Sequence, residues 1–253
     1  MAKIAVFDSG FGSLSIIKAI QKKVTSDIIY FADQENFPYG TKSVTQLRKI
    51  IKSTITMLEK KFKPNLIVIG SNTLSLLLKQ ITKKSKIIGV FPPLKEAVKN
   101  TKSHTIAILA TKSVVESNAL KNYIKKNVPK KIKVIKINAS PLVELVESGK
   151  FIDNKNLCKN KIKTIVLKPL LNNHVDVVTL SSTHLPFLLP MLKQIFPNIT
   201  FLDPANTVAN QVAKMSGTKK SKTNSIRIFT SGNVGVFQKH LLRLGIKNKV
   251  RSL

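Results

Sequence analysis

The sequence predicts an α/β protein of two domains, each built on a doubly wound, mostly parallel sheet. Short runs rich in β-branched residues alternate with longer amphipathic segments from end to end, which is typical of parallel strands joined by crossover helices. The number of these runs exceeds the number of strands that a single doubly wound sheet usually contains. Two prolines, Pro92 and Pro93, follow the fourth run and stop regular structure there, as expected at a crossing between domains.

The sequence also indicates where each domain begins and ends. Asp203-Pro204 marks the expected return to the first domain, so we expect a first domain of residues 1–94 plus 205–253 and a second of residues 95–204. The polar stretch 216–224 is expected to be a surface loop. The expected strands are 4–7, 27–31, 66–69, 86–90, 105–109, 133–137, 175–180, 199–202 and 226–229.

Composition favours a soluble, cytoplasmic protein. The chain has 253 residues, and 43% of them are hydrophobic, which is enough for buried cores. No apolar run approaches the roughly 20 residues that a membrane-spanning helix needs, and the N-terminus shows no signal-peptide core. We therefore expect no membrane partner. Cys158 is the only cysteine, so we also expect no intrachain disulfide and no cysteine-based metal cluster.

The net charge of +31 would ordinarily suggest a nucleic-acid partner. However, lysine is scattered over most polar segments, there is no Trp, and only three Tyr are present. Base recognition favours the arginine fork and aromatic stacking surfaces. We therefore expect no specific nucleic-acid partner and only nonspecific association with polyanions. The few arginines are Arg48, Arg227, Arg243 and Arg251.

Two matching segments place a serine where a buried strand ends and a helix is expected to begin. Ser71 follows the run 66–69, and Ser182 follows the run 175–180. In open α/β sheets this edge faces the ligand crevice, and helix N-terminal amides there favour a carboxylate or phosphate. Two such edges, one in each domain, could close on one small anion.

A glycine-rich turn, Asp8-Ser9-Gly10-Phe11-Gly12, follows the first strand. Gly10 and Gly12 have the spacing of a dinucleotide-binding turn, and Asp33 stands near the place of a ribose-binding acid. The third glycine position is Ser15, however, and an acid directly before the first glycine would lie close to a pyrophosphate. A simple tight turn is the alternative.

Four segments together resemble the signature set of cofactor-independent glutamate racemases, in order and spacing, and the resemblance covers essentially the whole chain. It implies two facing domains that close over glutamate, no metal and no cofactor, and a homodimer. The segments are Asp8-Ser9-Gly10, Pro38-Tyr39-Gly40-Thr41-Lys42-Ser43, Ser71-Asn72-Thr73 and Ser182-Thr183-His184-Leu185-Pro186.

The resemblance also implies a role for each matching residue. The family places a catalytic cysteine on each side of the substrate, and this chain has Ser71 and Ser182 at those positions. Asp8, Glu147 and His184 match the residues that support the two thiols. The remaining matches hold the amino acid, and they are Ser9, Pro38, Tyr39, Gly40, Asn72, Thr73 and Thr183.

Serine at both catalytic positions changes the expected chemistry. A thiol has a pKa of about 8.5 and readily forms a thiolate, whereas a serine hydroxyl does not supply a ready-made base for an α-proton. We therefore expect a protein that binds glutamate or a similar dicarboxylic amino acid, with weak or absent racemisation. Two alternatives stay open: an active racemase that uses the serines with Asp8 and His184, and a noncatalytic homologue that binds polyanions or proteins.

Three residues of the sequence could form a catalytic triad of the kind found in hydrolases. His184 lies two residues from Ser182, and Glu147 could complete a Ser-His-Glu arrangement. No acyl substrate is implied by the rest of the sequence, so a histidine held by structural contacts is the simpler interpretation.

Overall fold

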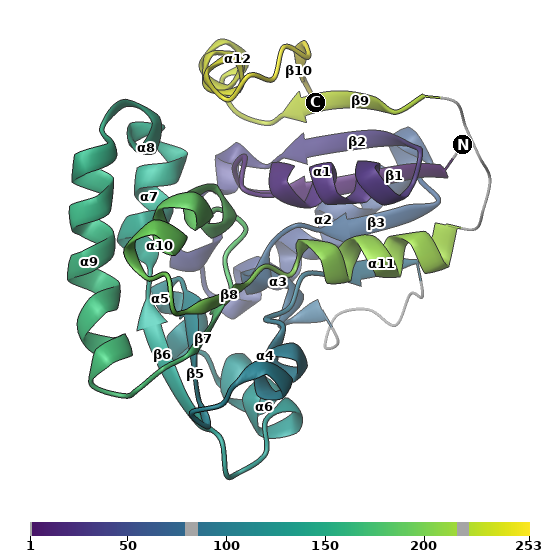
Figure 1. The fold of residues 1–253 in the computed structure, drawn as a ribbon. Helices are drawn as coiled ribbons and strands as arrows, with labels where there is room; N and C mark the ends of the chain where they lie inside the picture. The colour runs from purple at the N-terminus through teal and green to yellow at the C-terminus, as the bar shows by residue number, and fades with distance from the viewer. Residues whose placement is uncertain (1, 79–85, 217–222) are drawn as a thin grey trace. The chain divides into compact units, whose positions relative to one another are not determined.

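The computed structural model describes residues 2–78, 86–216 and 223–253 and divides them into two compact units. Unit 1 comprises residues 1–90 and 205–253, and unit 2 comprises residues 91–204. Each unit contains one sheet in which every strand pair is parallel (Figure 1). The predicted α/β class with two parallel sheets is confirmed.

Unit 1 has a six-stranded sheet in the order β10-β9-β2-β1-β3-β4. Its strands are β1 (Ala2–Asp8), β2 (Ser26–Ala32), β3 (Leu66–Ile69), β4 (Ile87–Gly89), β9 (Ser225–Thr230) and β10 (Val250–Ser252). Its helices are α1 (Leu14–Lys23), η1 (Gln34–Asn36), η2 (Tyr39–Thr41), α2 (Val44–Phe62), α3 (Asn72–Ser75), α11 (Ala205–Ser216) and α12 (Val234–Arg243).

Burial explains why these segments form the centre of unit 1. Strands β1, β2 and β3 are buried almost throughout, as expected of parallel strands covered on both faces. Helices α1 and α11 pack side by side against each other (Figure 1). Ser43 caps α2: its Oγ accepts from the Gln46 amide at 3.2 Å, and the Gln46 side chain accepts from the Ser43 amide at 2.8 Å.

Unit 2 has a four-stranded sheet in the order β6-β5-β7-β8. Its strands are β5 (Thr105–Ala110), β6 (Lys133–Asn138), β7 (Val177–Leu180) and β8 (Thr200–Leu202). Its helices are α4 (Leu94–Asn100), α5 (Lys112–Glu116), α6 (Asn118–Asn127), α7 (Ser140–Glu147), α8 (Lys150–Asp153), α9 (Lys155–Leu171), η4 (Leu185–Leu188) and α10 (Leu189–Ile195).

An acidic side chain fixes the amino edge of the sheet in unit 2. Asp176, just before β7, accepts from the Thr101 hydroxyl at 2.6 Å and from the Lys102 and Ser103 amides at 2.6 and 2.8 Å. Partial burial raises the pKa of Asp176, but these hydrogen bonds outweigh burial and hold the pKa below its ordinary value. The loop before β5 is therefore tied to β7 at the edge of this sheet opposite Ser182.

Every strand expected from the sequence is a strand in the structure, with ends shifted by at most two residues. β10 was not expected, and it pairs only with β9 at the outer edge of unit 1. Residues 217–222 of the expected loop 216–224 lie outside the described residues. Ser216 itself is the last residue of α11.

Candidate functional site

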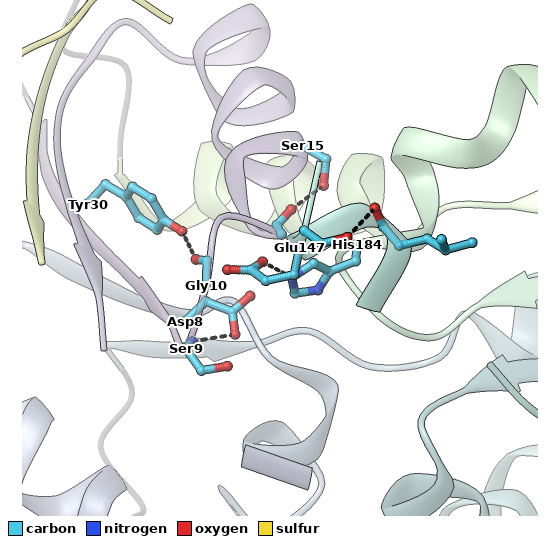
Figure 2. Close-up of polar contacts among 10 residues, drawn as sticks. Asp8, Ser9, Gly10, Ser15, Tyr30, Glu147 and His184 are labelled. Carbon is cyan, nitrogen blue, oxygen red and sulfur yellow. Dashed lines mark hydrogen bonds and ion pairs between the residues drawn. The ribbon is translucent and has the colours of Figure 1, made fainter. Parts of the chain in front are cut away.

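The carboxyl ends of β1, β2 and β3 meet at one edge of unit 1, because the three strands are parallel neighbours. Asp8 ends β1, and its carboxylate accepts from the Ser9 amide at 2.8 Å (Figure 2). Asp8 is 2% exposed and Ser9 is 6% exposed. The Tyr30 hydroxyl donates to the Gly10 carbonyl and so holds the turn that follows (Figure 2).

The loop after β2 brings Tyr39 to the same edge. Tyr39 is buried in η2, while Pro38 beside it is exposed and Gly40 is half-buried. The Tyr39 hydroxyl donates to Asp33 Oδ2 at 2.9 Å. Burial raises the pKa of Tyr39 well above its ordinary value, and the charges of Asp33 and Asp8 raise it further. Tyr39 therefore stays protonated and acts as a donor.

Asp33 has a role that the sequence analysis did not find. Its carboxylate also accepts from Asn36 Nδ2 at 2.9 and 3.0 Å. These contacts occupy the carboxylate that a dinucleotide-binding protein would direct to a ribose. A signal was present in the sequence, since an acid stands six residues before Tyr39 at the end of a strand, but only the folded loop shows which donors it meets.

The turn after β3 carries Ser71, Asn72 and Thr73. Ser71 and Asn72 are buried, at 7% and 3% exposed, and Thr73 is half-buried. Among the residues that the structure describes, neither Oδ1 nor Nδ2 of Asn72 has a hydrogen-bond partner. A buried polar group without a partner costs about 1 to 3 kcal/mol. Asn72 is thus a candidate ligand-binding side chain that the fold leaves unsatisfied.

Gly70 lets this turn approach the turn after β1. A Cβ at position 70 would lie 2.4 Å from Ser13 Cβ and 2.7 Å from Ser13 Oγ, closer than real side chains come. The Gly70 amide donates to the Phe7 carbonyl at 2.8 Å, which fixes the approach. Sequence analysis missed Ser13, whose contact with Gly70 depends on the pairing of β1 with β3.

Unit 2 presents the second serine at the end of β7. Ser182, Thr183 and His184 are all buried, at 8%, 3% and 4% exposed. The Ser181 amide donates to the Leu109 carbonyl at 2.8 Å, and the hydroxyls of Ser181 and Thr179 are 3.0 Å apart. Both contacts involve Ser181, so the residue directly before Ser182 is fixed to β5 and to β7.

His184 is paired with Glu147, which ends α7. His184 Nε2 lies 2.7 Å from Glu147 Oε2, and the two side chains are 5% and 13% exposed (Figure 2). The pairing of these two predicted residues orients the imidazole. A hydrolytic relay through Ser182 would have to use the other ring nitrogen, Nδ1.

A helix follows each serine, as expected, but both helices are short. α3 contains four residues, and Ser182 is followed by the 3-10 helix η4 instead of an α-helix. The dipole of a single turn is small, so ligand recognition at these edges depends on side chains and individual amides.

Cys158 does not replace the missing thiols. It lies in α9 with its side chain fully buried, and burial raises the pKa of its thiol. Among residues 2–78, 86–216 and 223–253, no cluster of three or more His, Cys, Asp or Glu side chains could hold a metal ion. Within the same ranges, no helix is long and apolar enough to cross a membrane.

Comparison with known proteins identifies the family to which the chain belongs. The sequence model of the Asp/Glu/Hydantoin racemase family matches residues 4–212, so the chain belongs to this family. A glutamate racemase from Buchnera aphidicola subsp. Schizaphis graminum is 33% identical over 231 residues, which cover 87% of this chain and 87% of that protein. The resemblance to glutamate racemases predicted from the four segments is confirmed.

Solved structures show the same fold. A glutamate racemase isoform from Bacillus anthracis matches with a TM-score of 0.86 at 24% identity, covering 100% of this chain and 97% of that one. The Escherichia coli glutamate racemase in complex with L-glutamate and the activator UDP-MurNAc-ala matches with a TM-score of 0.84 at 24% identity, covering 100% and 98%.

Proposed function

We propose that this protein binds glutamate or a closely similar dicarboxylic amino acid and that its racemase activity is weak or absent. The observation that carries the proposal is Asn72, a buried amide with no hydrogen-bond partner among the described residues. An amino acid offers both a carboxylate acceptor and an ammonium donor, which match the two ends of that amide. The glutamate bound to the Escherichia coli relative supports the choice of ligand.

The loss of activity follows from the two serines. Racemisation by two bases needs one group that removes the α-proton and another that returns a proton to the opposite face. A thiolate forms close to neutral pH, but a serine hydroxyl does not ionise there and can only pass on a proton when another base takes its own. Ser71 and Ser182 therefore leave a glutamate-binding site without either of its ready bases.

One observation favours a second candidate, a protein that still exchanges the α-proton. The His184–Glu147 pair is intact and buried, so a base remains near Ser182 in sequence. Such a protein would use Ser182 with His184, and Ser71 with Asp8. The α-proton of glutamate in D₂O distinguishes the two candidates when followed by NMR.

We expect little or no exchange in the unmodified protein and partial recovery when Ser71→Cys is combined with Ser182→Cys. Recovery should be incomplete, since a displacement of about 1 Å in a catalytic group can cost about a hundredfold in rate. Each single cysteine variant could exchange one enantiomer without inverting it. Rapid exchange by the unmodified chain would overturn impaired catalysis and support the second candidate.

Asn72→Leu tests ligand binding separately. An apolar side chain of similar size removes the unsatisfied amide, so the variant should unfold at a higher temperature than the unmodified protein, or at an equal one. It should also bind glutamate at least about tenfold more weakly, because a hydrogen bond to a charged group is worth about 1.5 to 3 kcal/mol. The control is Asn156→Leu on the exposed surface of α9. Unchanged calorimetric affinity in Asn72→Leu would place the ligand elsewhere.

The same proposal covers the other expected binding residues and the assembly. Thr73→Ala and Thr183→Ala should each weaken glutamate binding, measured by the same calorimetry. We also propose a cytoplasmic homodimer, on the resemblance alone, and sedimentation equilibrium tests the dimer.

A further inference from the structure

Asp33 joins three loops at the carboxyl edge of unit 1. It is 4% exposed and directly follows the last residue of β2. Its own amide donates to the Asp8 carbonyl at 2.7 Å, which links it to the end of β1. Its carboxylate receives Tyr39 and Asn36 from the loop after β2, and the Ser231 hydroxyl lies 3.4 Å away at the end of β9.

The direction of these hydrogen bonds is determined by the groups themselves. The Tyr39 hydroxyl stays protonated because burial and the nearby carboxylates raise its pKa, and an amide nitrogen can only donate. Asp33 is therefore the acceptor that both donors share. Hydrogen bonds to a charged acceptor are stronger than those between neutral groups, so this carboxylate holds the loop firmly.

The end of β9 strengthens the same cluster. The Thr230 hydroxyl lies 3.0 Å from Gln34 Oε1, and the Glu35 amide donates to the Ser231 hydroxyl at 3.2 Å. Both contacts hold η1, the short helix between Asp33 and Pro38. On the other side, η2 packs against α3, which begins with Asn72. The loop is thus fixed at its start by β9 and Asp33, and its far end lies against the proposed ligand-binding turn.

We propose that Asp33 is a positioning residue for ligand binding: through Tyr39 it fixes the segment Pro38–Gly40 against the turn that carries Ser71 and Asn72. This inference rests on the proposed binding of glutamate. Asp33 does not need to touch the ligand. It orders the loop before the ligand arrives, so that binding does not have to order it.

The test uses Tyr39→Phe, which keeps the buried ring and removes only the donor. We expect faster amide hydrogen exchange in residues 38–42, with exchange in β1, β2 and β3 unchanged. We also expect glutamate to bind about tenfold more weakly, the cost of one charged hydrogen bond. Tyr123→Phe is the matched control, because it removes a half-buried tyrosine hydroxyl in unit 2 that donates to the Pro92 carbonyl at 3.3 Å.

Asp33→Asn and the double variant complete the test. The double variant combines Asp33→Asn with Tyr39→Phe. If Asp33 acts through Tyr39, its affinity for glutamate should be no lower than that of the single variant with the lower affinity. The inference would be overturned if the losses in binding free energy of the two single variants added up in the double variant. It would also be overturned if amide hydrogen exchange of residues 38–42 were unchanged in Tyr39→Phe. The exchange measurement needs no ligand, so faster loop exchange in a protein that never binds glutamate would refute the proposed function and leave the ordering of the loop established.

Discussion

The two serine-bearing edges share a plan and differ in how their polar groups are satisfied. In unit 1, the turn after β3 buries Asn72 without a partner among the described residues. In unit 2, the turn after β7 buries His184 already paired with Glu147 at 2.7 Å. The same arrangement of strand, serine and turn therefore gives one edge that needs a ligand and one that completes its own hydrogen bonds.

This difference separates binding from stability. An unsatisfied buried amide lowers the stability of the empty protein and gains its hydrogen bonds only when a ligand arrives. A satisfied buried pair gains no new hydrogen bond on binding, but removing one of its two side chains destabilises the fold. Substitutions of Asn72 should therefore act mainly on affinity, and substitutions in the His184–Glu147 pair mainly on folding.

The largest effect should come from His184→Ala. It removes the imidazole that faces Glu147 Oε2 at 2.7 Å, and breaking a buried pair in this way costs about 3 to 5 kcal/mol. Urea denaturation would measure the loss in the free energy of unfolding.

Two glutamate variants provide the matched comparison. Glu147→Gln should cost less than His184→Ala, since an amide oxygen can still accept from Nε2. Glu144→Gln on the exposed side of α7 should change little. Equal stability in His184→Ala and the unmodified protein would contradict the stabilising role assigned to the pair.

Gly70→Ala should have an intermediate effect on unit 1. The added methyl would meet Ser13 Cβ at 2.4 Å, and overpacking of this kind typically costs about 1 to 3 kcal/mol. Ser13→Gly in the same chain should restore most of the loss by removing the obstructing side chain. Thermal unfolding of both variants measures the coupling.

The control for this pair is Gly235→Ala in α12, where the added Cβ would meet only Asn233 Oδ1 at 3.4 Å. It should be neutral or slightly stabilising, because alanine favours a helix more than glycine does. If Gly70→Ala and Gly235→Ala change the unfolding temperature by the same amount, the turns after β1 and β3 can move apart to accommodate a methyl group.

The smallest effect at physiological salt should be the binding of polyanions. Exposed lysines occur in both units, for example Lys52 and Lys60 on α2 and Lys155 and Lys163 on α9, so charge does not distinguish the two. DNA binding followed by fluorescence anisotropy should be independent of sequence and weaken at least about a hundredfold between about 50 and 200 mM salt. Selective binding that persists at high salt would favour the noncatalytic, polyanion-binding alternative.

The sequence predicted the strands because buried parallel strands are continuous apolar runs with polar segments on either side. β10 escaped prediction for the opposite reason: it has three residues, Val250–Ser252, of which only Val250 is buried. Its extended conformation comes from pairing with β9, a long-range contact that no local pattern records.

The site residues at the ends of strands could be predicted from the sequence, but the contacts between loops could not. Ser71 and Ser182 each lie two positions after the last residue of an apolar run, so their place at the carboxyl edges could be predicted from the sequence. The contact of Gly70 with Ser13 and that of Asp33 with Ser231 join segments far apart in the chain. They depend on how β1 pairs with β3 and β2 with β9, and the residues themselves have no local signature.

The buried state of Cys158 makes this chain a convenient subject for thiol-specific labelling. Its side chain is fully buried in α9 and its thiol has a raised pKa, so maleimide or iodoacetamide should modify it slowly in the folded protein. The serines at positions 71 and 182 keep 7% and 8% of their surface exposed, so a cysteine introduced at either position should react faster than the native one. The rate of modification, with and without glutamate, would report how open each introduced thiol is and whether the ligand covers it.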